Sequence, residues 1–329
     1  MDNNTHLATA IDAITPLKVR YDKNIKELLA DVQILAYILK YTVSEVADLS
    51  LEEIMECIDQ DSIQIGTVPI SPGLTNTRRI ENTQTEDADP GESYITFDLR
   101  FSLTVHPFYI IGNAIKIIIN LEAQKSSDAG KIGYHLENRI TYYMARLISS
   151  QKETEFFHSD YDNIKKIYSI WICMDCKTES ISQISLTQKE LFGKADAQMT
   201  FDKMHAIIIQ LKKSNEKSNS KNRLIAMLED LLCNEDRNNK KNRLKEKYGM
   251  KMTIELEGRL ANMCNLSDLV VERSMECGME RGISAIILDN LRENTSKERI
   301  IEKLQEYFSL SPDKANAYFE KYASQDTKS

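Results

Sequence analysis

The apolar positions of the chain repeat with a helical period near its two ends and follow an extended pattern between them. From Tyr21 to Leu39, apolar residues recur every three or four positions, which predicts a helix with Asp22 as its cap. Ser50 and Glu53 have the form of a capping box and predict the start of a second helix. Apolar runs further along predict strands, so the order of elements indicates a mixed α/β protein. The predicted strands are Tyr94–Val105, Ile117–Gln124, Ile167–Met174, Ser180–Leu186 and Met204–Leu211.

Shifts in composition divide the chain into three parts. Residues 66–93 are rich in Pro, Gly, Thr and Asn and predict a long irregular connection. A helix is expected from about Gly133 to Gln151, and from Ser214 onward the pattern is helical, with the last two helices divided at Ser309–Pro312. We therefore expect a lead-in of residues 1–20, a core of residues 21–211 and a helical C-terminal region of residues 212–329.

The predicted strand Ile117–Gln124 changes character along one of its faces. In an extended chain, Ile118, Asn120, Glu122 and Gln124 share one face, while the opposite face is wholly apolar. A carboxylate at the end of a buried strand needs a partner, most simply a cation or a metal ion. The strand therefore predicts half of a site at Glu122.

A second carboxylate is expected beside the first. The predicted strand Tyr94–Val105 is expected to pair antiparallel with the strand of Glu122, and it carries Asp98 on its polar face. Carboxylate oxygens hold hard divalent ions such as Mg²⁺ or Mn²⁺, which activate water for attack on phosphodiesters. Asp98, Glu122 and the Ala123 carbonyl would be ligands, and Gln124 would orient water or contact phosphate. The alternative is an Asp and a Glu at solvent-facing strand ends, a pattern that also arises by chance.

Composition limits the class of protein. With 329 residues and 42% hydrophobic content, the chain is long enough for a sizeable core and is not a disordered sequence. No apolar run reaches the roughly 18 to 20 residues of a membrane span, and the first residues lack the features of a signal peptide. Six cysteines are spread thinly, which suits reduced thiols. We therefore expect a cytoplasmic protein with no membrane partner.

Charge is distributed unevenly along the sequence. The chain has a formal net charge of −8, yet residues 212–251 hold twelve Lys or Arg against six Asp or Glu. This basic segment is a pointer to a polyanion partner, and its alternative is a solvated helical face.

Several ordered motifs resemble a known family. The chain is similar to the PD-(D/E)XK nuclease family transposases, relatives of the recombination-promoting nucleases, from about Tyr21 to Leu211. The helical tail, with Glu276–Gly282, also resembles the family's Glu/Gly-rich C-terminal stretch. The motifs that carry the resemblance are Phe97–Leu99, Ile119–Gln124, Gly133–Tyr134, Arg139 with Tyr142–Tyr143, Ser149–Gln151 and Ile167–Cys173.

The resemblance implies a restriction-endonuclease-like core, with a mixed central sheet flanked by helices. It places Asp98 and Glu122 at the D and (D/E) positions, with Glu86 and Glu27 as further acidic contributors. Arg139 and Tyr143 share one face of the helix after the site, which either contacts phosphate or packs on the sheet.

The sequence departs from the general family pattern at one position. Gln124 stands two residues after Glu122, where the pattern has lysine, and an amide neither carries charge nor accepts a proton. Lys125 points to the opposite face if the strand continues. A strand that ends at Gln124 would bring Lys125 back toward a phosphate.

The leading hypothesis is a metal-dependent DNA endonuclease linked to mobile elements or recombination, using Mg²⁺ or Mn²⁺, with DNA as its partner. One alternative is a catalytically degenerate nucleic-acid-binding protein that keeps the fold. Another is a helical interaction protein that forms homo-oligomers through residues 253–322.

Overall fold

The computed structural model divides the chain into two compact units, Asn24–Asn262 and a second formed by Met1–Lys23 with Met263–Ser329. The division differs from the predicted boundary at residue 211, because the helices that follow that residue pack within the first unit. The described residues are 19–66, 97–193, 202–212, 218–233 and 236–326, of which 265–277 and 324–326 are described by their backbone alone.

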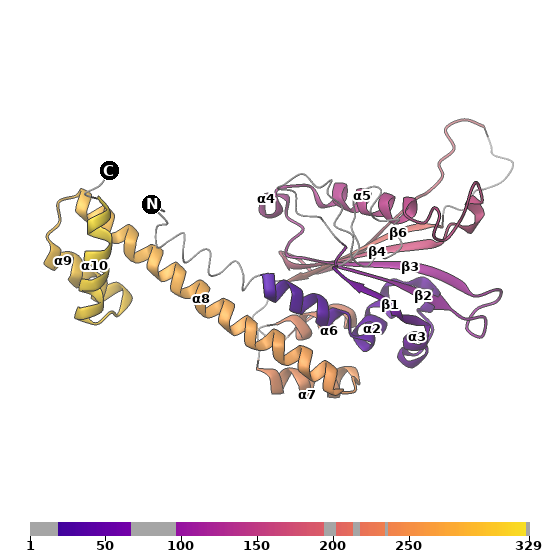
Figure 1. The fold of residues 1–329 in the computed structure, drawn as a ribbon, viewed down its shortest axis with the longest axis horizontal. Coiled ribbons are helices and arrows are strands. Elements are labelled where there is room, and N and C mark those ends of the chain that lie inside the picture. The colour runs from indigo at the N-terminus through magenta and orange to yellow at the C-terminus, as the bar shows by residue number, and fades with distance from the viewer. Residues whose placement is uncertain (1–18, 67–96, 194–201, 213–217, 234–235, 327–329) are drawn as a thin grey trace, which may run out of the picture. The chain divides into compact units, whose positions relative to one another are not determined.

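A six-stranded mixed sheet forms the centre of the first unit (Figure 1). Its strand order is β1-β2-β3-β4-β6-β5, in which β3, β4 and β6 run parallel and the other pairs are antiparallel. The sheet confirms the predicted α/β fold and the antiparallel pairing of the two strands around the candidate site. The strands are β1 Ile58–Ile65, β2 Leu99–Val105, β3 Ile115–Gln124, β4 Lys166–Cys176, β5 Ser180–Ser185 and β6 Met204–Lys212.

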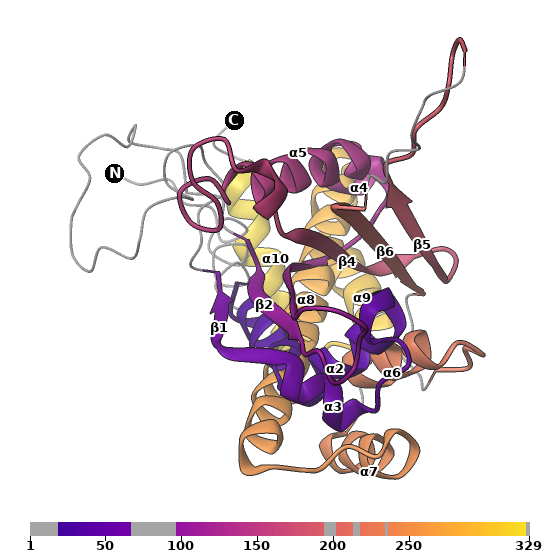
Figure 2. The same cartoon turned by 90° about the vertical axis from the view of Figure 1, so that its right-hand side faces the viewer.

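Helices cover both faces of this sheet (Figures 1 and 2). Helix α5 packs on β4 and β6 from one side, while α2 and α6 lie on the other. Within the described residues, no helix is both long and apolar enough to cross a membrane. Besides a helix at residues 19–29, the helices are α2 Val32–Thr42, α3 Leu51–Cys57, α4 Ala129–Ile132, α5 Leu136–Ser149, α6 Arg223–Leu232, α7 Arg237–Tyr248, α8 Ile254–Arg292, α9 Lys297–Phe308 and α10 Pro312–Asp326.

The N-terminal helix expected between Tyr21 and Leu39 is two helices. The chain leaves the first at Ala30, and Asp31 then caps α2 by accepting a hydrogen bond from the Gln33 backbone N–H at 3.0 Å. The short Asp side chain competes with backbone carbonyls for backbone N–H groups. It therefore favours the end of one helix and the start of the next. The cap is therefore Asp31, and the prediction of a single helix was wrong.

Glycine also moves the start of the helix that covers the site. The predicted helix from Gly133 to Gln151 is divided because Gly133 adopts a left-handed conformation, with φ of 81°, at the end of α4. That conformation is accessible to glycine without steric cost. Helix α5 therefore begins at Leu136, and it buries Ile140, Tyr143 and Leu147 against the sheet.

Strand β1 was not predicted from the sequence. Five of its eight residues, Asp59–Ser62 and Gln64, are polar, and its pairing with β2 is interrupted between Asp59 and Gln64. Among the described strands, β1 lies at an edge of the sheet. An edge strand can fold with few apolar residues. Strand β1 therefore lacks the alternation of apolar and polar residues from which a strand is predicted.

The basic helix α7 is fixed to α6 by one buried carboxylate. Asp230 on α6 accepts hydrogen bonds from Arg243 (3.0 Å), Lys247 (2.9 Å) and Tyr248 (2.6 Å) on α7. The backbone N–H of Ser218 also donates to it, at 3.0 Å. Burial alone would raise the pKa of Asp230, but the hydrogen bonds from Tyr248 and Lys247 outweigh it and lower the pKa.

Other basic side chains of the 212–251 segment are also engaged within the unit. Lys240 is buried and donates to the Cys233 carbonyl at 2.8 Å. Arg237 and Lys241 form ion pairs with Glu257 of α8. Much of the segment's positive charge therefore holds α7 in place, and less of it is available to an external polyanion.

The second unit contains a three-helix packing of α8, α9 and α10. Its two last helices are divided at Ser309–Pro312, as predicted. Glu280 of α8 accepts a hydrogen bond from the Tyr322 hydroxyl of α10 at 2.9 Å. A Cβ at Gly282 would lie 3.2 Å from the Phe308 ring, so glycine allows this ring to pack against α8. The buried side chains are Ile283, Ile287, Ile300, Leu304, Ala315, Phe319 and Tyr322.

The Asp230→Asn variant is expected to lower the free energy of unfolding by roughly 3 kcal/mol, because it leaves two cations without their buried partner. Since the pKa of Asp230 is lower in the folded state, its stabilisation is complete above pH about 4 and is lost as the pH falls below that value. Urea unfolding of both proteins from pH 3 to pH 8 measures this difference. The exposed Glu246→Gln on α7 is the matched control, and an equal loss in both variants would contradict the account.

Candidate active site

The two predicted carboxylates meet at one end of the sheet through reciprocal hydrogen bonds. The Asp98 backbone N–H donates to Glu122 Oε1 at 3.1 Å, and the Ala123 backbone N–H donates to Asp98 Oδ2 at 2.9 Å. This arrangement follows from the pairing of Leu99 with Leu121, which places the start of β2 beside the end of β3. Asp98 itself lies in a bend immediately before β2, so its predicted position within the strand was wrong by one residue.

Glu122 is almost fully buried, with 2% of its surface exposed. Burial, and then the negative charge of Asp98, raise the pKa of Glu122 well above its ordinary value. Asn120, two residues earlier on the same face of β3, hydrogen-bonds to the Glu122 carboxylate and donates to Ser169 Oγ at 3.3 Å. Ser169 in turn accepts from the Trp171 indole at 2.8 Å. Glu122 is therefore held by a row of buried, hydrogen-bonded polar side chains.

A lysine that the sequence analysis did not single out reaches Asp98. Lys26 Nζ lies 2.8 Å from Asp98 Oδ1, and the two side chains are 20% and 14% exposed. Lys26 belongs to the helix of residues 19–29, which is more than 70 positions away in sequence. No local pattern marks this lysine, since only the packing of the helix brings it to the carboxylates.

Arg139 lies beside Glu122, the second carboxylate of the pair. Its NH2 is 3.9 Å from Glu122 Oε2 and donates to the Tyr143 hydroxyl at 2.6 Å. Its NH1 donates to Tyr134 at 2.5 Å and to Gln124 Oε1 at 3.2 Å. The guanidinium also lies 4.9 to 5.6 Å from the ring centroids of three aromatic side chains, those of Tyr134, Tyr143 and Trp171.

Tyr143 is 2% exposed and packs edge-on against Phe97 with ring centroids 5.4 Å apart. Burial raises the pKa of its hydroxyl, which therefore stays protonated at neutral pH. This burial does not fit the predicted contact between Tyr143 and a phosphate. The ring instead holds Arg139, whose side chain is 29% exposed.

The remaining predicted site residues are Lys125, Glu27 and Glu86. Strand β3 ends at Gln124, so Lys125 lies in an exposed bend beside the site rather than on the opposite strand face. Within the described residues, no three His, Cys, Asp or Glu side chains form a metal-binding group, so Glu27 does not join the two carboxylates. Glu27 offers its backbone carbonyl to Arg259 at 2.7 Å. Glu86 lies outside the described residues.

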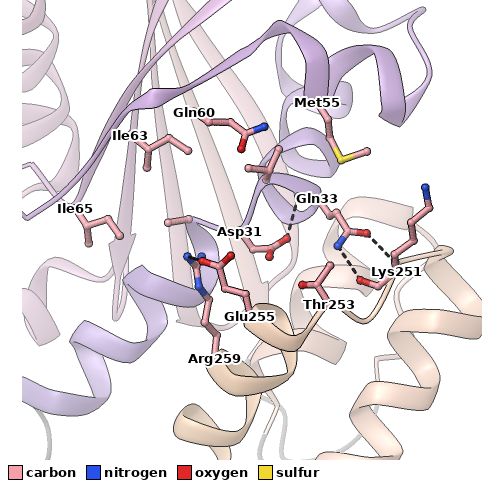
Figure 3. A pocket seen from close by; sticks show the side chains of 12 residues that line it. Asp31, Gln33, Met55, Gln60, Ile63, Ile65, Lys251, Thr253, Glu255 and Arg259 are labelled. Carbon is pink, nitrogen blue, oxygen red and sulfur yellow. Dashed lines mark hydrogen bonds and ion pairs between the residues drawn. The ribbon is translucent and has the colours of Figure 1, made fainter.

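A pocket of about 580 Å³ lies elsewhere in the first unit, and neither predicted carboxylate lines it (Figure 3). It is bordered by the starts of α2 and α8 and by β1. Polar side chains of this pocket hold the fold together: Asp31 caps α2, Arg259 pairs with Glu255, and the Gln33 amide bridges to the Lys251 backbone at 2.7 and 2.8 Å. The chemistry of the protein is therefore better sought at the carboxylate pair than in this pocket.

One known protein family matches the chain. A family model described as PD-(D/E)XK nuclease family transposase matches residues 109–273, half of the chain. The chain belongs to this family. The match includes Glu122, Gln124 and Arg139, while Asp98 precedes it. Searches of the curated proteins and of the solved structures gave no match.

The two carboxylates of this PD-(D/E)XK transposase fit a hard divalent metal ion. The Asp98 and Glu122 carboxylates would supply oxygen ligands, and Mg²⁺ is typically held by one or two carboxylates together with water and substrate phosphate. Nucleases of the PD-(D/E)XK type generally use divalent metals. Two protein carboxylates are therefore sufficient for such an ion, and a third acidic ligand is not required.

Trp171 makes metal binding measurable without a substrate. It is the single tryptophan of the chain, and it pairs directly with Glu122 across β3 and β4. Paramagnetic Mn²⁺ at the carboxylates is expected to quench its fluorescence in a saturable manner, with reversal by excess Mg²⁺. Glu122→Gln should lose the saturable quenching, whereas the exposed Glu137→Gln should retain it. Equal quenching of Glu122→Gln and the wild type would place Mn²⁺ elsewhere.

Proposed function

We propose that the chain is a metal-dependent DNA endonuclease of the PD-(D/E)XK transposase type, acting in recombination or in the movement of mobile elements. The observation that carries this proposal is the reciprocal hydrogen bonding of Asp98 and Glu122. It holds two carboxylates together where β2 begins and β3 ends. Even with Lys26 and Arg139 beside the pair, burial and the charge of Asp98 raise the pKa of Glu122, and this cost favours a functional reason for its position.

Within this proposal, Asp98, Glu122 and the Ala123 carbonyl hold Mg²⁺ or Mn²⁺. The bound ion would polarise the scissile phosphate and lower the pKa of the attacking water. Gln124 has its side-chain oxygen held by Arg139, so its amide N–H groups are left to orient water or to contact a phosphate oxygen. The pairing of β3 with β4 extends to Gln124 and fixes the end of the strand.

DNA phosphates are proposed to contact Arg139 and Lys125. Arg139 is partly exposed and is held in one orientation by Tyr134 and Tyr143, so little conformational entropy is lost when it binds. Lys125 is exposed in the bend after β3 and can reach outward. Tyr143 is proposed to position Arg139 rather than to contact DNA.

A second candidate function is DNA binding without cleavage. The specific observation in its favour is that two cations, Lys26 and Arg139, already lie beside Asp98 and Glu122. In a degenerate site these side chains would replace the metal ion. This candidate predicts salt-dependent DNA binding, no saturable Mn²⁺ binding and no cleavage.

Nicking of supercoiled plasmid in Mg²⁺ or Mn²⁺ tests the proposed function. The wild type is expected to convert supercoiled DNA to open circles, and chelation of the metal should stop the reaction. Asp98→Asn and Glu122→Gln should each reduce nicking to the background level, because each removes a negatively charged ligand.

The exposed Glu137→Gln, purified in the same way, should nick like the wild type and so controls for a contaminating nuclease. An intact wild-type protein that fails to cleave single-stranded, double-stranded or supercoiled DNA with either metal would reject the nuclease.

A further inference from the structure

We propose that Lys26, on the helix of residues 19–29, supplies the catalytic positive charge that Gln124 cannot provide. This inference rests on the proposed nuclease function, which it deepens by naming a further residue of the same site. In the general family pattern the position two residues after Glu122 carries a lysine, and here the ammonium group reaches the site from a different element.

The position of Lys26 is set by the packing of its helix. Its neighbours Ile25, Leu28 and Leu29 are buried in the core of the unit, so the helix cannot turn without exposing them. The Arg259 side chain fastens the same helix by donating to the Glu27 carbonyl at 2.7 Å. The backbone of Lys26 is thus held in place, while its ammonium group lies 2.8 Å from Asp98 Oδ1.

Lys26 suits this role better than the two other cations nearby. Arg139 is restrained by hydrogen bonds to Tyr134, Tyr143 and Gln124, so its position is fixed beside Glu122. Lys125 is exposed in a bend. A lysine ammonium carries three donors on a flexible stem, so Lys26 can move from Asp98 to a phosphate oxygen or to the attacking water without moving its helix.

The ion pair has a consequence that separates catalysis from structure. Lys26 competes with a divalent ion for the Asp98 carboxylate and repels that ion. Its removal should therefore strengthen metal binding while it slows cleavage. If Lys26 only maintained the shape of the site, its removal would weaken both.

Lys26→Met keeps the apolar stem and removes the charge. Its Mn²⁺ affinity, measured by quenching of Trp171, is expected to increase several-fold. Its single-turnover cleavage rate at saturating metal is expected to fall about 10²-fold, the usual cost of losing one charged donor from a transition state. Lys26→Arg should stay within about tenfold of the wild type, because it keeps the charge.

The double variant Lys26→Met/Gln124→Lys adds a compensating test, because it returns a lysine to the position beside Glu122. It is expected to recover at least tenfold of the rate lost by Lys26→Met. Lys23→Met, an exposed lysine of the same helix, is the matched control and should retain both metal affinity and cleavage.

Four results would overturn the inference. Cleavage by Lys26→Met at the wild-type rate, with Asp98→Asn inactive, rejects Lys26 and leaves the nuclease intact. Loss of both metal affinity and cleavage in Lys26→Met and in Lys26→Arg assigns the lysine a structural role only. Loss of cleavage in Lys125→Met but not in Lys26→Met transfers the role to Lys125. A wild type that binds Mn²⁺ but never cleaves rejects the proposed function, and the catalytic role of Lys26 with it.

Discussion

The site depends on the burial of one carboxylate. Glu122 lies at the end of a strand that is buried on both faces, and a negative charge in such a place is stable only with donors and cations around it. The Asp98 backbone, the Asn120 amide and Arg139 meet only part of that requirement, because the pKa of Glu122 still lies well above its ordinary value. Strand β2, the buried Asn120–Ser169–Trp171 chain and α5 each contribute to the surroundings of Glu122.

The surroundings of Glu122 combine rigid support with one adaptable group. Arg139 is enclosed by three aromatic rings, and Trp171 is fully buried beneath it. Lys26 reaches Asp98 on a flexible stem. A rigid carboxylate pair fixes the place where a metal ion would bind, while a mobile ammonium group can follow charge as it develops on a phosphate.

Much of this arrangement could be predicted from the sequence. The alternation in β3 placed Glu122 and Gln124 on one face, and the antiparallel neighbour of β3 supplied Asp98. Both features are local, since a period of two and a short connection determine them.

Other features depend on contacts between distant parts of the chain. Lys26 acquires its place through helix packing, and Arg259 fastens that helix from more than 200 residues away. The first unit extends beyond the predicted boundary at residue 211, and Asp230 binds α7 to α6 within it. Strand β1 was not predicted because its polar sequence does not alternate with apolar residues. The break at Asp31 was missed because apolar periodicity continues across it.

The central claim, that Asp98 and Glu122 bind one divalent ion, is tested most directly by anomalous diffraction from crystals grown with Mn²⁺. The account predicts a manganese peak with oxygens of both carboxylates at roughly 2.0 to 2.6 Å. A manganese-soaked crystal with Lys26 still paired to Asp98 and no peak between the two carboxylates would contradict it.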